Sequence, residues 1–88
     1  MPRICEFFGI VIRMYWFDTD KHKLPHFHAK YGEFKAVFDL EGKLIEGSLG
    51  NRADKLVAEW SELRRDEIHN AWKRAVNGEE IPWVRPIR

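Results

Sequence analysis

The chain has 88 residues and a net charge of +1, with 44% hydrophobic and 33% charged residues. This is the composition of one small globular domain, and we treat residues 1–88 as a single domain. The near-neutral charge argues against an extended nucleic-acid-binding surface, because such domains are usually strongly basic.

Cys5 is the only cysteine, so the chain cannot form an internal disulfide. That favours a reducing compartment, the cytoplasm, and the apolar neighbours of Cys5 predict a buried, unreactive thiol. We expect no membrane association, since no apolar run is long enough to span a bilayer.

The first half of the chain has the pattern of short β-strands. Residues 10–17, IVIRMYWF, are rich in the β-branched and aromatic types that strands favour, and Ile10, Ile12 and Met14 point to one side. Gly9 ends the strand before them, and Glu41-Gly42 forms a turn before the last one. The strand candidates in chain order are residues 4–8, 10–17, 26–31, 33–40 and 43–47.

The two central strand candidates each have an apolar face and a polar face. Alternation places Phe27, Ala29 and Tyr31 in the core on one strand, and Phe34, Ala36, Phe38 and Leu40 on the next. A two-residue loop at Tyr31-Gly32 would pair Lys30 with Glu33, His28 with Lys35 and His26 with Val37. The two histidines then lie on the less apolar face of the sheet.

From Asn51 onward the hydrophobic period becomes helical. Asn51 is a suitable N-cap for one helix, and Asp66 for a second, with Ile68, Ala71 and Trp72 on its apolar stripe. A single bent helix over residues 52–77 is the alternative, and Asn77-Gly78 is a typical helix stop. We expect Trp83 in the proline-containing tail to pack back on the body.

These elements predict an α+β fold. Its sheet is an antiparallel β-meander of four to five strands, followed by one or two C-terminal helices packed on one face. The helices would cover the apolar side of the sheet. The histidine side is then either open to solvent or covered by a partner.

Three of the four histidines fall within seven residues, which suggests a metal site. His26 and His28 are two apart on a strand, so they point the same way, and His22 can add a third ligand from the preceding loop. Three protein ligands with an open position is the arrangement of a catalytic zinc site. The sequence establishes no cofactor, and the cofactor that these histidines could bind is a divalent metal ion.

Acid–base catalysis is a second hypothesis for the same residues. His26 and His28 can act as general acid and base on an RNA phosphodiester, with Lys35 stabilising the charge that develops on the phosphate. The third hypothesis is structural: the imidazoles hydrogen-bond nearby aspartates and hold the loop in place. The predicted binding surface around the histidines consists of Arg13, Tyr15, His22, Lys30 and Glu33, with Trp83 as an additional anchor for a partner.

The segment PHFHAKYGE, from Pro25 to Glu33, together with MPRICEFFGIVIRMYWFD, LEG and KLVAEW, resembles the domain-of-unknown-function 4160 family of small bacterial proteins. The resemblance implies a cytoplasmic bacterial protein that acts through a small protein partner from the same operon, as a component of a toxin–antitoxin-like gene pair. The family's histidine motif maps onto His22, His26 and His28. Two departures are Leu24, where the family often has a second proline, and Arg64, where it often has a histidine. RNA and a second copy of the chain remain alternative partners.

Overall fold

The computed structural model describes residues 3–14 and 24–87, which form five strands and two helices. The fold is α+β, as the sequence predicted. The strands come first and the helices follow, so the two kinds of element are segregated along the chain. In order, the elements are β1 Arg3–Phe7, β2 Ile10–Arg13, β3 His26–Tyr31, β4 Phe34–Asp39, β5 Leu44–Gly47, α1 Asn51–Leu63 and α2 Arg65–Val76.

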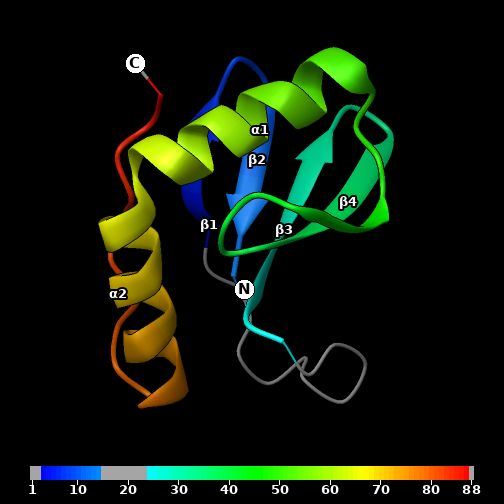
Figure 1. Cartoon of the computed structure of the whole chain (residues 1–88). Coiled ribbons are helices and arrows are strands. Elements are labelled where there is room, and N and C mark those ends of the chain that lie inside the picture. The colour runs from blue at the N-terminus through cyan, green and yellow to red at the C-terminus, as the bar shows by residue number, and fades with distance from the viewer. Residues whose placement is uncertain (1–2, 15–23, 88) are drawn as a thin grey trace.

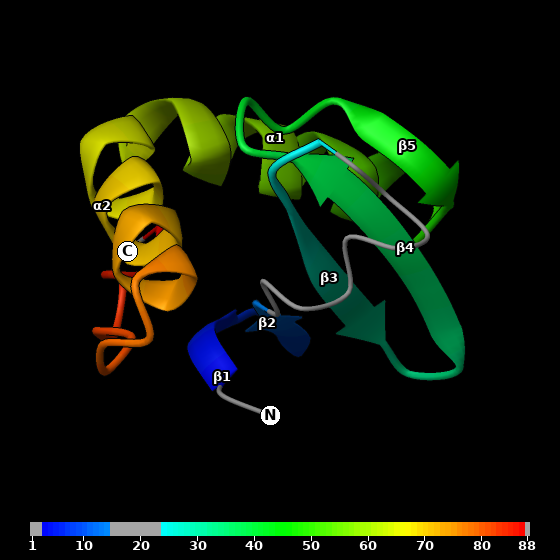
Figure 2. The same cartoon turned by 90° about the horizontal axis from the view of Figure 1, so that it is seen from below.

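The five strands form one antiparallel meander in the order β1-β2-β3-β4-β5. Each strand pairs with the next one along the chain, so the connections are short hairpins except where the segment of residues 14–25 joins β2 to β3. Figure 1 shows α1 crossing the sheet and α2 turning down past β1. Figure 2 places β5 at the other end of the sheet, far from α2.

The register of the β3–β4 hairpin differs from the prediction. Tyr31 pairs with Phe34, so the two loop residues are Gly32 and Glu33, one position later than expected. The reason is Gly32, whose positive φ of 61° suits the first central position of the turn, where a type II′ hairpin requires glycine. His28 therefore faces Val37, not Lys35. The partner of each β3 residue therefore moves by two positions along β4. Because two positions keep a side chain on the same side of a strand, the predicted faces of both strands are retained.

The helical half consists of two helices and not one bent helix. The break is at Arg64, whose φ of −108° and ψ of 25° lie outside helical geometry. Asn51 is the first residue of α1 and not its cap. Its predicted role falls to Gly50 as N-cap, while Asp54 accepts hydrogen bonds from the Leu49 backbone N–H at 2.8 Å and the Ser48 hydroxyl at 2.5 Å. The predicted stop at residues 77–78 is confirmed, since α2 ends at Val76.

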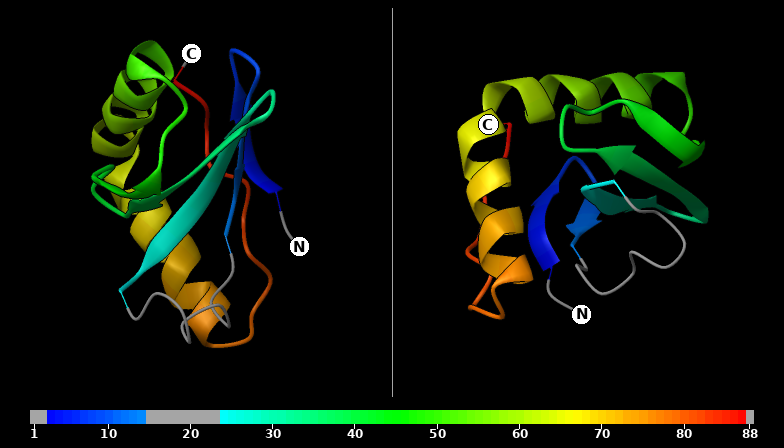
Figure 3. Two further views of the ribbon diagram at one scale, coloured as in Figure 1. Left: turned by 90° about the vertical axis from the view of Figure 1, so that its right-hand side faces the viewer. Right: turned by 60° about the horizontal axis from the view of Figure 1, so that its bottom comes forward.

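The core lies between the sheet and α1, which crosses one face of it (Figure 3). Trp60 of α1 is fully buried, with its ring 5.4 Å from that of Phe27, and Phe27 stacks on Phe38 at 5.6 Å. Cys5 is also fully buried, and this burial raises the pKa of its thiol from 9.0 to about 11. The prediction of a buried cysteine is confirmed, and the raised pKa keeps the thiol in its unreactive, protonated form at neutral pH.

The C-terminal tail is held down by Val84 and not by the predicted Trp83. Val84 is fully buried and its backbone N–H donates a 2.7 Å hydrogen bond to the Ile4 carbonyl of β1, whereas Trp83 is 55% exposed. Proline fixes the backbone direction on either side, and Val84 is the residue that turns inward. In the part of the chain that the structure describes, no helix is long and apolar enough to cross a membrane.

Candidate functional site

His26 and His28 lie next to each other on β3 and project to the same side of the sheet. Their ring centroids are 5.2 Å apart, with an angle of 66° between the planes. His26 is fully buried, and its Nδ1 is 2.8 Å from the Leu24 carbonyl oxygen. Because a carbonyl oxygen only accepts hydrogen bonds, this contact places a proton on Nδ1 and fixes the orientation of the ring.

The indole of Trp72 on α2 covers the imidazole of His26. The two ring centroids are 5.8 Å apart, with an angle of 50° between the planes. The expectation that the histidine side is open to solvent, or is covered by a partner, is therefore wrong at His26, because this chain covers it. Alternation along a strand describes two faces of a flat sheet, and it cannot show that a later helix folds over the first residue of β3.

The exposed part of the same face is basic. Arg13 faces His28 across the β2–β3 pair, and Lys30 faces Lys35 across the β3–β4 pair. Lys30 and Lys35 are exposed, whereas Arg13 and His28 are half-buried. Glu33 lies in the adjoining hairpin turn and is also exposed. The structure thus brings most of the predicted surface together at one end of the β3–β4 hairpin.

The remaining predicted site residues do not join this face, or cannot be placed. Trp83 lies in the tail that pairs with β1, and β2 separates β1 from β3 in the sheet. Tyr15 and His22 lie outside the described residues, and with His22 the predicted three-histidine metal site does too. Within residues 3–14 and 24–87, no group of three or more His, Cys, Asp or Glu side chains is placed to hold a metal ion.

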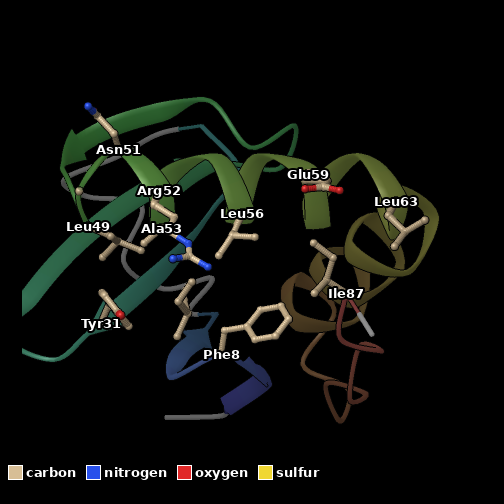
Figure 4. Close-up of a pocket in the computed structure, with 12 residues that line it drawn as sticks. Phe8, Tyr31, Leu49, Asn51, Arg52, Ala53, Leu56, Glu59, Leu63 and Ile87 are labelled. Atoms are coloured by element: carbon tan, nitrogen blue, oxygen red, sulfur yellow. The ribbon is translucent and has the colours of Figure 1, made fainter.

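A concave site that the sequence analysis did not predict lies between α1 and the turns of the β1–β2 and β3–β4 hairpins. It is a groove of about 760 Å³ (Figure 4). Ala53 and Leu56 line it from α1, and Leu49 and Ile10 extend its apolar surface. We call it the α1 groove. Its rim is formed by Phe8, Tyr31, Leu63 and Ile87.

Three apolar side chains at the rim are exposed to solvent. Phe8 is 58% exposed, Leu63 is 55% exposed and Tyr31 is 42% exposed. A single exposed apolar residue is common on protein surfaces, whereas several gathered around a groove are typical of a binding surface. Tyr31 and Phe34, which is 60% exposed, were assigned to the core on strand alternation, so their exposure corrects both assignments. Both residues lie at the end of their element, beyond the reach of the core.

The backbone at Phe8 is strained. Phe8 and Gly9 form the two-residue turn between β1 and β2, with φ of 50° and 81°. A turn with positive φ at both positions favours Asn-Gly, and a bulky residue in the left-handed region costs about 1–2 kcal/mol. Such outliers gather at functional sites. The signal in the sequence was a phenylalanine at a position where the chain must turn.

A comparison with known protein families assigns the chain to one of them. None of the curated proteins and none of the solved structures matches it. The family model described as "Domain of unknown function (DUF4160)" matches residues 9–73, from the turn before β2 to the last turn of α2. Both histidines of β3 and most residues of the α1 groove fall inside this range. Since the matched range is more than half of the chain, this protein belongs to the DUF4160 family.

Proposed function

We propose that the protein acts by binding a protein partner, as the cytoplasmic bacterial component of a toxin–antitoxin-like gene pair. The α1 groove supports the proposal that the protein binds a partner, because its lining is mostly apolar and its rim residues Phe8, Tyr31 and Leu63 are exposed. The gene-pair context rests on the resemblance of the sequence to its family. The partner is then the small protein encoded beside this one.

The groove suits a protein segment because its apolar lining continues onto an exposed rim. Side chains of a partner can fill the groove while its backbone passes over the rim residues, and contacts of this kind form the desolvated centre of protein interfaces. The strained backbone of Phe8 at the rim fits this role. An enzyme acting through His26 has less support, because the imidazole is buried beneath Trp72.

The test is co-purification of the tagged protein with the protein of the adjoining gene, using a matched pair of variants. Leu63 and Val76 are each the last residue of a helix, and they are 55% and 48% exposed, but only Leu63 lines the groove. Leu63→Asp should abolish the complex, because it places a charge in the apolar contact. Val76→Asp has the same unfavourable charge at a helix C-terminus and should leave the complex intact.

A second variant separates binding from stability. Phe8→Asn supplies the residue that the turn prefers, so it should raise the free energy of unfolding by up to about 1 kcal/mol. It should also weaken the complex, because it removes an aromatic ring from the rim. Growth curves after induction of each gene alone and of both together complete the test. The absence of both a complex and any growth effect would contradict the proposed function.

A further inference from the structure

Two opposite charges lie on the wall of the α1 groove and have no polar partner among the residues that the structure describes. Arg52 and Glu59 both line the groove from α1. Within the described residues, neither side chain takes part in an ion pair, a side-chain hydrogen bond or another polar contact. Both side chains are exposed, and beside the apolar part of the lining each can gain from an opposite charge brought by a ligand. A ligand of the groove would therefore place an acidic group near Arg52 and a basic group near Glu59.

The helix fixes the separation of the two charges. Arg52 and Glu59 are seven residues apart, which is close to two helical turns, so they project from the same side of α1 about 10 Å apart along its axis. Figure 4 shows Leu56 between them, so an apolar contact separates the cationic part of the wall from the anionic part. A ligand that satisfies all three residues presents an acid, an apolar group and a base in a row.

This spacing matches a helix better than a strand. In a helix, residues seven apart lie on one side and are about 10 Å from each other, as in α1 itself. In an extended strand, side chains on one face are two or four residues apart, which gives about 7 or about 13 Å. A helix lying along α1 therefore matches the spacing of Arg52 and Glu59 directly, whereas a strand would be about 3 Å too short or too long.

We propose that the α1 groove binds an amphipathic helix of the partner protein, with an acidic residue facing Arg52 and a basic residue seven positions away facing Glu59. Between them, apolar side chains of the partner helix fill the space beside Leu56 and contact the rim residue Phe8. This inference rests on the proposed function, because it specifies the partner of the same groove. The apolar contacts supply most of the affinity, and the two charges select the partner.

The experiment uses three fluorescent helical peptides with the same apolar stripe. They differ only at two positions seven residues apart, which carry Glu and Lys, Lys and Lys, or Glu and Glu. The Glu/Lys peptide should bind the natural protein most tightly, and each mismatched charge should weaken binding about two- to five-fold. Arg52→Glu should shift the preference to the Lys/Lys peptide, and Glu59→Arg should shift it to the Glu/Glu peptide. The preferences of the two variants do not depend on the direction in which the peptide lies, because the peptides that they select carry the same charge at both positions.

Control variants change the charge of α1 outside the groove. Lys55→Glu and Glu62→Arg alter exposed residues of the same helix that do not line the groove, so neither should change the order of preference. Equal binding of the three peptides to the natural protein would overturn the inference, and so would no binding of any of them. If Leu63→Asp still abolished the complex with the adjoining gene's protein, the proposed function would stand without the inference. Loss of the Leu63 effect would remove both.

Discussion

At the scale of single residues, the two histidines of β3 differ although they are only two positions apart. His26 is enclosed by Trp72 and bonded to the Leu24 carbonyl, whereas His28 is half-buried. We expect His26→Ala to lower the free energy of unfolding by about 2–4 kcal/mol, because it leaves a cavity beside the indole. His28→Ala should cost less than about 1 kcal/mol. Urea unfolding followed by tryptophan fluorescence measures both values.

The difference decides how the ribonuclease hypothesis is tested. Lost activity in His26→Ala would report partial unfolding as much as missing chemistry, so His28→Ala and Lys35→Ala are the informative variants. Equal loss of stability in the two histidine variants would contradict the structural role of His26. The metal hypothesis is tested by metal analysis of the purified protein, and it stays a prediction because one of its three ligands, His22, is outside the described residues.

At the scale of elements, α1 packs directly on the turn between β4 and β5. A Cβ atom on Gly42 would lie 2.8 Å from the Cα of Ala58 and 2.9 Å from the Cβ of Ser61, and the φ of Gly42 is +85°. Helix and turn therefore meet backbone to backbone, with no space for a side chain. Gly42→Ala should lower the free energy of unfolding by about 2–4 kcal/mol, as measured by thermal or urea unfolding.

Gly78 provides the matched control for this contact. Its φ is also positive, at +72°, but no atom lies within 4 Å of the place that a Cβ would occupy. Gly78→Ala should cost only the backbone term of about 1 kcal/mol. Similar losses in the two variants would show that conformation alone, and not the contact with α1, makes Gly42 necessary.

At the scale of the whole molecule, the C-terminal tail ties the sheet to both helices. The Arg85 carbonyl accepts a hydrogen bond from the Trp60 indole at 2.9 Å, and the Pro86 carbonyl accepts two from the Arg64 guanidinium at 3.0 and 3.1 Å. Arg64 stands where the family often has a histidine, and here it anchors the tail. A hydrogen bond from the Arg85 side chain holds the pKa of Glu67 on α2 below its ordinary value.

Because Cys5 is buried, the stability of the molecule should vary with pH in the alkaline range. The pKa of the thiol is about 11 in the folded chain against an ordinary value of 9.0, so between these values the folded chain keeps a proton that the unfolded chain releases. The free energy of unfolding should therefore fall as the pH rises from about 9 to about 11. The stability difference between the natural protein and Cys5→Ala should shrink between about pH 8 and about pH 10.5. A constant difference would contradict the raised pKa.

The elements, their order and most of their buried faces follow from the sequence alone. Periods of two and of 3.6 residues are local properties, because each follows from the backbone geometry of its own element. Ile10, Ile12 and Phe27 are buried as alternation requires, and Trp60 is buried as helical spacing requires. Even the error in the β3–β4 register was local, since it came from placing Gly32 at the wrong position of the turn.

Which surfaces are covered and which stay open depends on how the elements pack together. Trp72 covers His26 from the far half of the chain, and the α1 groove joins residues from Phe8 to Ile87. Neither contact has a local pattern, because each depends on the angle at which a helix crosses the sheet. The histidine motif can be recognised in the sequence because its residue types are rare and chemically active. The groove consists mostly of ordinary apolar residues, which become distinctive only when the fold leaves them exposed together.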